Sequence, residues 1–168
     1  MALLRKLPAQ IRNFETFPRD GLTGREIQNK TLLIVGVGNI GHEIAKIAKA
    51  LGTKVLGVDI VQKHPDIEYV TIQKGIKQAD MIVSAMNLTD DNRNYFNYDL
   101  LKQTRPQTIF VNISRGEMSP STDLLRLLKE NHLAGLALDV YNNEPNLAVA
   151  LRSNTIPNDP EIKATIQL

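Results

Sequence analysis

The sequence lacks cysteine, a long apolar run and an excess of either charge. With zero cysteines it can form no disulfide framework, no thiolate zinc site and no cysteine nucleophile, and this fits a reducing compartment. No apolar stretch reaches the length of about 20 residues that spans a bilayer, and nothing near the start resembles a signal-peptide cleavage site. We therefore expect a cytoplasmic protein that is neither secreted nor inserted in a membrane.

The charge balance also argues against a nucleic-acid partner. The formal net charge is +2, and the lysines and arginines are spread along the chain rather than gathered in a basic patch. A length of 168 residues with 42% hydrophobic residues predicts one domain with a real core, but not two full domains. Small molecules or other proteins are the expected partners.

Apolar, β-branched runs alternate with segments of helical periodicity along the chain. Strands are predicted over 31–35, 54–58, 81–84, 109–112 and 136–140, with a weaker one near 69–72, and the clearest helices over 40–51 and 120–130. Ser119 is the expected N-cap of the second helix, and Asn131 the left-handed residue that ends it. This order predicts an α/β fold, a Rossmann-type doubly wound parallel sheet in three layers.

The chain divides into three segments on composition. Residues 1–25 are interpreted as an N-terminal helix, predicted within 1–12, and a connector; 26–145 as the sheet domain; and 146–168 as a truncated C-terminal segment. Periodicity is lost from Asn146 onward, where Pro157 and Pro160 are expected to break the chain. Because parallel strands share one carboxyl edge, the residues expected to meet there are Gly36, Asp59, residues 84–87, Arg115 and Asp139.

A glycine-rich turn, Gly36-Val37-Gly38-Asn39-Ile40-Gly41, follows the first predicted strand and opens a predicted helix. Gly36 would permit the tight turn, Gly38 the approach of a pyrophosphate, and Gly41 close packing of helix on strand. Asp59 comes eighteen residues later, at the end of the next strand, where its carboxylate can accept hydrogen bonds from ribose hydroxyls and would repel a 2′-phosphate. The pattern therefore predicts a dinucleotide site that favours NAD.

Two alternatives stay open for this turn. The glycines can merely shape a turn while Asp59 caps a strand, or the site can take another adenine nucleotide ligand such as S-adenosylmethionine. On position alone, Arg115 just past a strand end can likewise be a catalytic group, a structural ion-pair partner or a phosphate ligand, and Glu144 can be ordinary loop decoration.

The stretches 112–116 (Asn-Ile-Ser-Arg-Gly) and 134–145, together with the lead-in 23–31 and the glycine turn, resemble the cofactor-binding domain of the D-isomer-specific 2-hydroxyacid dehydrogenases over about residues 22–145. The resemblance implies hydride transfer between NAD(H) and a small 2-hydroxy or 2-keto acid. It makes 26–145 the NAD-binding domain and 146–168 a segment leading to a substrate domain. By position it implies that Arg115 is the catalytic arginine and Glu144 the partner of a catalytic histidine. It places Asn39, Ile40, Ile113 and Asp139 at the cofactor.

The sequence departs from the family pattern in its histidines. His42, His64 and His132 lie at other positions and are interpreted as exposed or structural, so we expect a partial enzyme that lacks the catalytic histidine, is inactive alone and binds no metal. Asn87 and Asn92 also replace the family's usual proline and threonine.

Further alternatives follow from the same resemblance. The family includes relatives that act on formate, phosphite or phosphoglycerate, and NAD-sensing corepressors in which protein binding is the function. It also implies a homodimer in which residues 1–25 offer an apolar stripe of Leu3, Leu4, Leu7 and Ile11. The other interpretation of that stripe is that it packs on its own domain.

Overall fold

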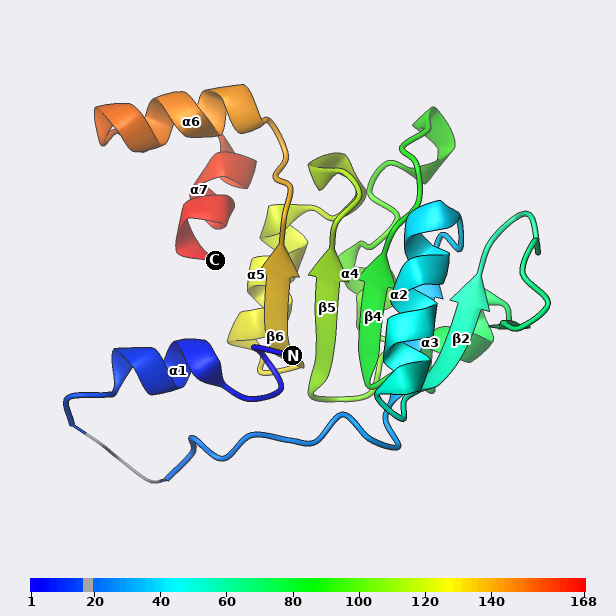
Figure 1. Cartoon of the computed structure of the whole chain (residues 1–168). Helices are drawn as coiled ribbons and strands as arrows, with labels where there is room; N and C mark the ends of the chain where they lie inside the picture. The colour runs from blue at the N-terminus through cyan, green and yellow to red at the C-terminus, as the bar shows by residue number, and fades with distance from the viewer. Residues whose placement is uncertain (17–19) are drawn as a thin grey trace.

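The computed structural model describes residues 1–16 and 20–168 and is built around a six-stranded, all-parallel sheet with the strand order β3-β2-β1-β4-β5-β6 (Figure 1). Its strands are β1 (Thr31–Val35), β2 (Lys54–Val58), β3 (Glu68–Tyr69), β4 (Met81–Ser84), β5 (Thr108–Asn112) and β6 (Leu133–Leu138). The chain starts in the middle of the sheet, winds outward to β3, and then crosses back to β4 beside β1. This reversal of direction confirms the doubly wound fold and creates a crevice at the carboxyl ends of β1 and β4.

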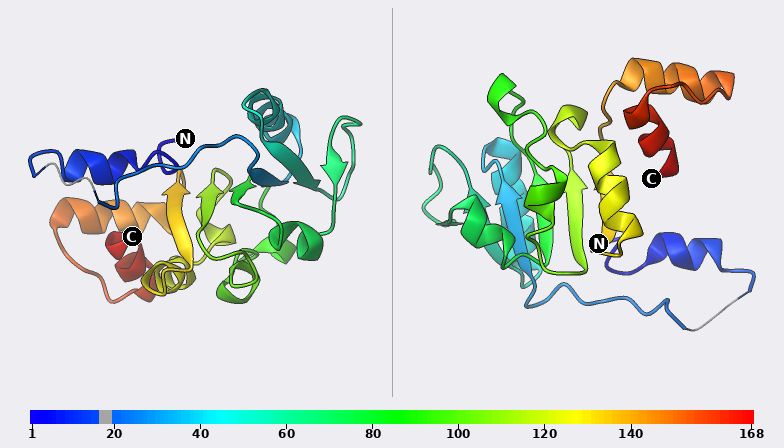
Figure 2. Two further views of the ribbon diagram at one scale, coloured as in Figure 1. Left: turned by 90° about the horizontal axis from the view of Figure 1, so that it is seen from below. Right: turned by 180° about the vertical axis from the view of Figure 1, so that it is seen from behind.

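Helices cover both faces of the sheet (Figure 2). Helix α2 (Asn39–Ala50) lies on the same face as the N-terminal segment that contains α1 (Leu7–Arg12). The opposite face carries α3 (Ile72–Ile76), α4 (Tyr98–Leu101) and α5 (Ser121–Lys129). Helices α6 (Glu144–Ser153) and α7 (Pro160–Gln167) follow β6, and short 3-10 turns span Asp90–Asn92 and Gly116–Met118.

The core alternates along each central strand because successive side chains point to opposite faces. In β1, Leu33 and Val35 pack with Phe96, Phe110 and neighbours under α3 to α5. Leu32 and Ile34 pack instead with Ala45 and others under α2. After Thr31 the strand is apolar because both of its faces are buried, as is usual in parallel sheets.

Three sequence expectations were wrong or displaced. The last strand is β6, Leu133–Leu138, rather than 136–140, and the weak strand is only Glu68–Tyr69 because Ile72 already begins α3. The N-cap of α5 is Pro120 rather than Ser119. The hydroxyl of Ser119 accepts a hydrogen bond from buried Asn112 instead of capping the helix. Asn131 does adopt the left-handed conformation, with φ 53°.

Helices α6 and α7 occupy most of the segment after Asn146, contrary to the loss of periodicity in the sequence, and Pro157 lies in the link between them. Pro160 does not break the chain there: it sits in the first turn of α7, where a missing N–H costs nothing. Asp159 caps this helix by accepting hydrogen bonds from the N–H groups of Glu161 and Ile162. The helix is anchored on α5, where Glu161 accepts from the Ser121 N–H at 2.7 Å.

The N-terminal segment divides between its own domain and solvent. Leu4 is 4% exposed and Leu3 is half-buried beside Gly135, whereas Leu7 and Ile11 are 44% and 76% exposed. Leu4 therefore packs on its own domain, whereas the dimer contact expected for the stripe stays a prediction. In the described part of the chain no helix is long and apolar enough to cross a membrane.

Candidate cofactor and substrate site

The glycine turn connects β1 to α2 through two backbone contacts that leave no room for a side chain. Gly36 has φ +94°, and a Cβ atom there would lie 2.5 Å from the backbone nitrogen of Met86 at the end of β4. A Cβ on Gly41 would collide with the carbonyl oxygen of Gly36 and crowd Ile34. The two glycines thus bring the start of α2 and the loop after β4 against the end of β1.

Gly38 differs from these two glycines because the space beside it is open. Apart from Gly38 and its two chain neighbours, no atom of the described residues lies within 4 Å of the position that a Cβ on Gly38 would take. Helix α2 begins at the next residue, Asn39, without a side-chain cap, so its first N–H groups are free to meet an anion. Open space beside a bare backbone and a helix N-terminus fits a pyrophosphate.

Asp59 directly follows β2 and is tied to the glycine turn. Its Oδ2 atom accepts a hydrogen bond from the N–H of Val37 at 2.6 Å, and Oδ1 accepts from the N–H of Val61 at 3.0 Å. Each carboxylate oxygen can accept a second hydrogen bond, so both stay able to take a ribose hydroxyl. The residue therefore fits the ribose position of NAD while it also orders the turn that meets the phosphates.

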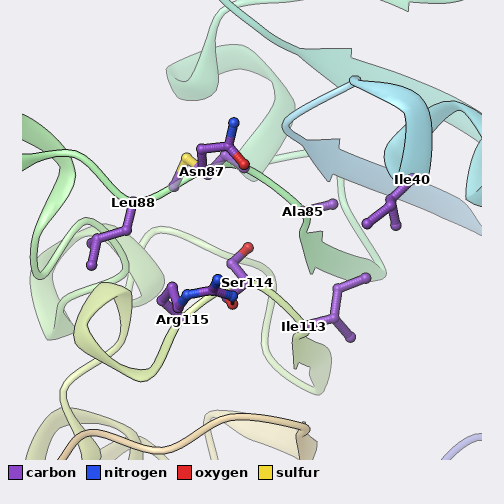
Figure 3. Close-up of a pocket in the computed structure, with 8 residues that line it drawn as sticks. Ile40, Ala85, Asn87, Leu88, Ile113, Ser114 and Arg115 are labelled. Carbon is purple, nitrogen blue, oxygen red and sulfur yellow. Dashed lines mark hydrogen bonds between the residues drawn. The ribbon is translucent and has the colours of Figure 1, made fainter.

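A pocket of about 250 Å³ lies beside the turn, at the carboxyl edge of the sheet (Figure 3). It gathers side chains from the first turn of α2, the loop after β4 and the loop after β5, namely Ile40, Ala85, Met86, Asn87, Leu88, Ile113, Ser114 and Arg115. Of the sequence-predicted residues it unites Ile40, Ile113 and Arg115. The sequence did not single out Ala85, Met86, Leu88 and Ser114 individually, although Ala85 and Met86 fall within the stretch 84–87 predicted at this edge.

A buried network of hydrogen bonds holds the loop that carries Arg115. Asn112 is 0% exposed; its amide donates to the carbonyl of Arg115 at 2.9 Å, and its Oδ1 accepts from the N–H of Ser114 at 2.9 Å. The hydroxyls of Ser84 and Ser114 are hydrogen-bonded at 2.8 Å, which joins this loop to β4. Sequence reasoning placed Asn112 only within a motif and did not find this role.

The Arg115 side chain is exposed and has no carboxylate partner in the parts of the chain that are described. Its one recorded side-chain hydrogen bond goes from Nη1 to the carbonyl of Ser114 at 2.8 Å. A structural ion pair therefore does not explain this arginine. Most of its planar guanidinium is free to bind an anion bidentately.

Gly116 brings the second predicted signature against the first. A Cβ on Gly116 would collide with the backbone of Tyr141 and Asn142, so only glycine allows these loops to touch. Glu144 begins α6 just beyond, with its Oε1 accepting from the N–H of Tyr141 at 3.0 Å. Asp139 is exposed, and its N–H donates to the carbonyl of Asn112 at 3.0 Å. No recorded hydrogen bond or ion pair within the described ranges joins Glu144 to Arg115.

The histidines lie away from this pocket. His132 precedes β6, at the amino edge of the sheet, and its Nε2 contacts the hydroxyl of Thr104 at 3.0 Å. His42 and His64 stack on each other beside α2. None of the three lines the pocket that contains Arg115. Asn92, one of the departures from the family pattern, supports that pocket's wall by donating to the carbonyl of Asn87 at 2.8 Å.

A doubly wound parallel sheet whose glycine turn, helix N-terminus and strand-end carboxylate meet at the crevice defines the class of dinucleotide-binding domains. Within that class, the family described as "D-isomer specific 2-hydroxyacid dehydrogenase, NAD binding domain" matches residues 1–158. The chain belongs to this family and is its NAD-binding domain.

Similar proteins agree with this assignment. The chain is 35% identical over 127 residues to a D-lactate dehydrogenase of Streptococcus agalactiae, covering 73% of this chain and 38% of the relative. It is 30% identical to an aromatic 2-oxoacid reductase of Clostridium sporogenes, covering 97% and 51%. The NAD-complexed D-isomer specific 2-hydroxyacid dehydrogenase of Lactobacillus delbrueckii ssp. bulgaricus superposes with a TM-score of 0.84 at 27% identity, covering 100% of this chain and 54% of that one. The chain therefore spans about half or less of these proteins.

Proposed function

We propose that this domain serves an oxidoreductase that interconverts a small 2-hydroxy acid and its 2-keto acid. The observation that carries the proposal is the free guanidinium of Arg115 in a pocket that also contains Ile40 from the glycine-turn helix. NAD, when bound at this turn, supplies or accepts the hydride. The names of the relatives above, a D-lactate dehydrogenase and an aromatic 2-oxoacid reductase, support a 2-oxo acid as the substrate class.

Each of the predicted site residues has a role consistent with its place. Gly38 and the free N–H groups at Asn39 and Ile40 would hold the pyrophosphate, and Asp59 the ribose. Arg115 would grip the substrate carboxylate with two parallel hydrogen bonds and polarise the neighbouring carbonyl. Ile113 and Asp139, at the ends of β5 and β6, would bound the nicotinamide side of the site.

Glu144 would act on a proton through an imidazole. One of its oxygens is occupied by the Tyr141 N–H, and the other is left to accept a hydrogen bond. A carboxylate beside an imidazole stabilises the protonated form, which raises the imidazole pKa and suits a general acid. Since His42, His64 and His132 lie elsewhere, we propose that this imidazole comes from outside the 168 residues and that the domain alone does not turn over.

A homodimer is the assembly that we propose. An apolar groove of about 390 Å³ lies between α2 and the N-terminal segment and is lined by Leu3, Ile47, Leu51, Val111 and neighbours. A contiguous exposed apolar surface favours burial against another surface, and a second copy of the chain presents the same groove. Leu7 and Ile11, in the same N-terminal segment, are also exposed. The expected cytoplasmic location and the absence of nucleic-acid or membrane partners stay predictions from the sequence.

Thermal unfolding with ligands tests the function. We expect NADH to raise the melting temperature and NADPH or S-adenosylmethionine to leave it unchanged. Oxamate, a 2-keto acid mimic, should add a further rise to the NADH-loaded protein, and Arg115→Gln should abolish only that second rise. Arg105→Gln, an exposed arginine at the other edge of the sheet, is the matched control. A rise with NADH but none with oxamate would contradict the substrate role and point to a nucleotide-sensing protein-binding module.

A further inference from the structure

Three side chains with metal-ligating atoms meet beside the first turn of α2, and none of them lines the Arg115 pocket. His42 comes from the first turn of α2, and His64 and Asp66 from the loop between β2 and β3. One potential ligand atom from each lies within 4.8 Å of the other two. The sequence did not indicate this cluster, because the rest of α2 and the strand β2 separate His42 from the other two residues.

The contacts within the cluster are already close to those of a coordination site. His42 Nε2 lies 3.0 Å from Asp66 Oδ1, and the rings of His42 and His64 stack with centroids 3.7 Å apart and planes inclined by 13°. Nε2 of His64 is shielded from solvent and has no hydrogen-bond partner among the described residues.

We propose that His42, His64 and Asp66 bind a divalent transition-metal ion of the zinc type. Two imidazoles and one carboxylate form a donor set that suits zinc, with water in the fourth position. Zinc bonds of about 2.0–2.2 Å in a tetrahedron place neighbouring donors about 3.4 Å apart. His42 Nε2 and Asp66 Oδ1, now 3.0 Å apart, therefore need to move apart only slightly to bind the ion. The His64 ring has to tilt out of the stack, because its lone pair lies in the plane of the ring.

The surroundings set the conditions for binding. Lys49 donates a hydrogen bond to Asp66 Oδ2 at 2.9 Å and so holds this carboxylate beside His42. Oδ1 of Asp66 can bind the ion while Oδ2 keeps its hydrogen bond from Lys49. Two contacts hold the loop in place. The backbone N–H of His64 donates a hydrogen bond to the Tyr69 hydroxyl, and the side chain of Ile67 is buried in the core at 6% exposure.

Zinc titration of the tag-free, chelator-treated protein tests the proposal. Calorimetry and metal analysis after gel filtration should show saturable binding of one Zn²⁺ per chain and none of Mg²⁺, which prefers an octahedron of oxygens. His64→Ala and Asp66→Asn should each weaken zinc binding by about tenfold or more. His132→Ala, which removes a histidine at the opposite end of the domain, should leave it unchanged.

The outcomes decide the proposal independently of the cofactor. No saturable zinc binding, or binding by His64→Ala that equals the wild type, overturns it. Circular dichroism of each variant shows whether the fold is kept, and Asp66→Asn preserves the side-chain shape in case His64→Ala loosens the loop. The NADH-induced rise in melting temperature, measured on the metal-free protein, reports on the dinucleotide site alone, so failure of one proposal does not mimic failure of the other.

Discussion

Replacing Gly38 by alanine separates cofactor binding from folding. The backbone at Gly38 has φ −78° and ψ −155°, which an L-residue can adopt. A Cβ there would meet no described atom within 4 Å apart from those of its two chain neighbours. The cost to the unliganded protein is therefore small, within about 1 kcal/mol for the less favourable helix cap. The same methyl group occupies the space that a pyrophosphate needs, so NADH binding should be lost.

The size of the effect follows from ligand linkage. At a concentration a hundredfold above Kd, a ligand stabilises the native state by about 2.7 kcal/mol. At about 2–4 °C per kcal/mol for a domain of this size, NADH should raise the wild-type melting temperature by about 5–11 °C. Differential scanning fluorimetry of Gly38→Ala should show a nearly unchanged baseline and no rise with NADH. A variant that still gains the full rise would refute the placement of the pyrophosphate.

Three further results are expected. Gly41→Ala should lower the unfolding free energy by about 1–3 kcal/mol in urea, because its methyl group collides with the Gly36 carbonyl; an unchanged midpoint would contradict this close packing. Asp59→Asn should reduce the preference for NADH over NADPH, measured as the ratio of their dissociation constants, by roughly tenfold, because it removes a charge that repels the 2′-phosphate. An unchanged preference in calorimetry would count against that role. A hydrogen bond from Lys102 lowers the pKa of Glu130 from 4.5 to about 2, so the stabilisation is present above pH 4.5 and is lost as the pH falls toward 2; the melting-temperature deficit of Glu130→Gln should shrink over that window.

The parts of the fold that the sequence predicted are those with local signals. The strands, the glycine turn and Asp59 can each be predicted from a few neighbouring residues, through periodicity or turn chemistry. Helix α7 was missed because Asp-Pro reads equally well as a chain break and as a helix start, and only contact with α5 distinguishes the two. The meeting of His42 with His64 was also hidden, since it depends on how the β2–β3 loop folds back on α2.

The site shows the same division at finer scale. Arg115 and Glu144 stand out by residue type, but their relation is set by Gly116, whose missing side chain lets the loop after β5 touch Tyr141 after β6. Gly36 does the same between the ends of β1 and β4, against Met86. Backbone against backbone therefore fixes the spacing of four strand ends, and the functional side chains extend from that frame. Even small side chains at these glycines would move the walls of the pocket apart, so the geometry of the site and the packing of the sheet edge change together.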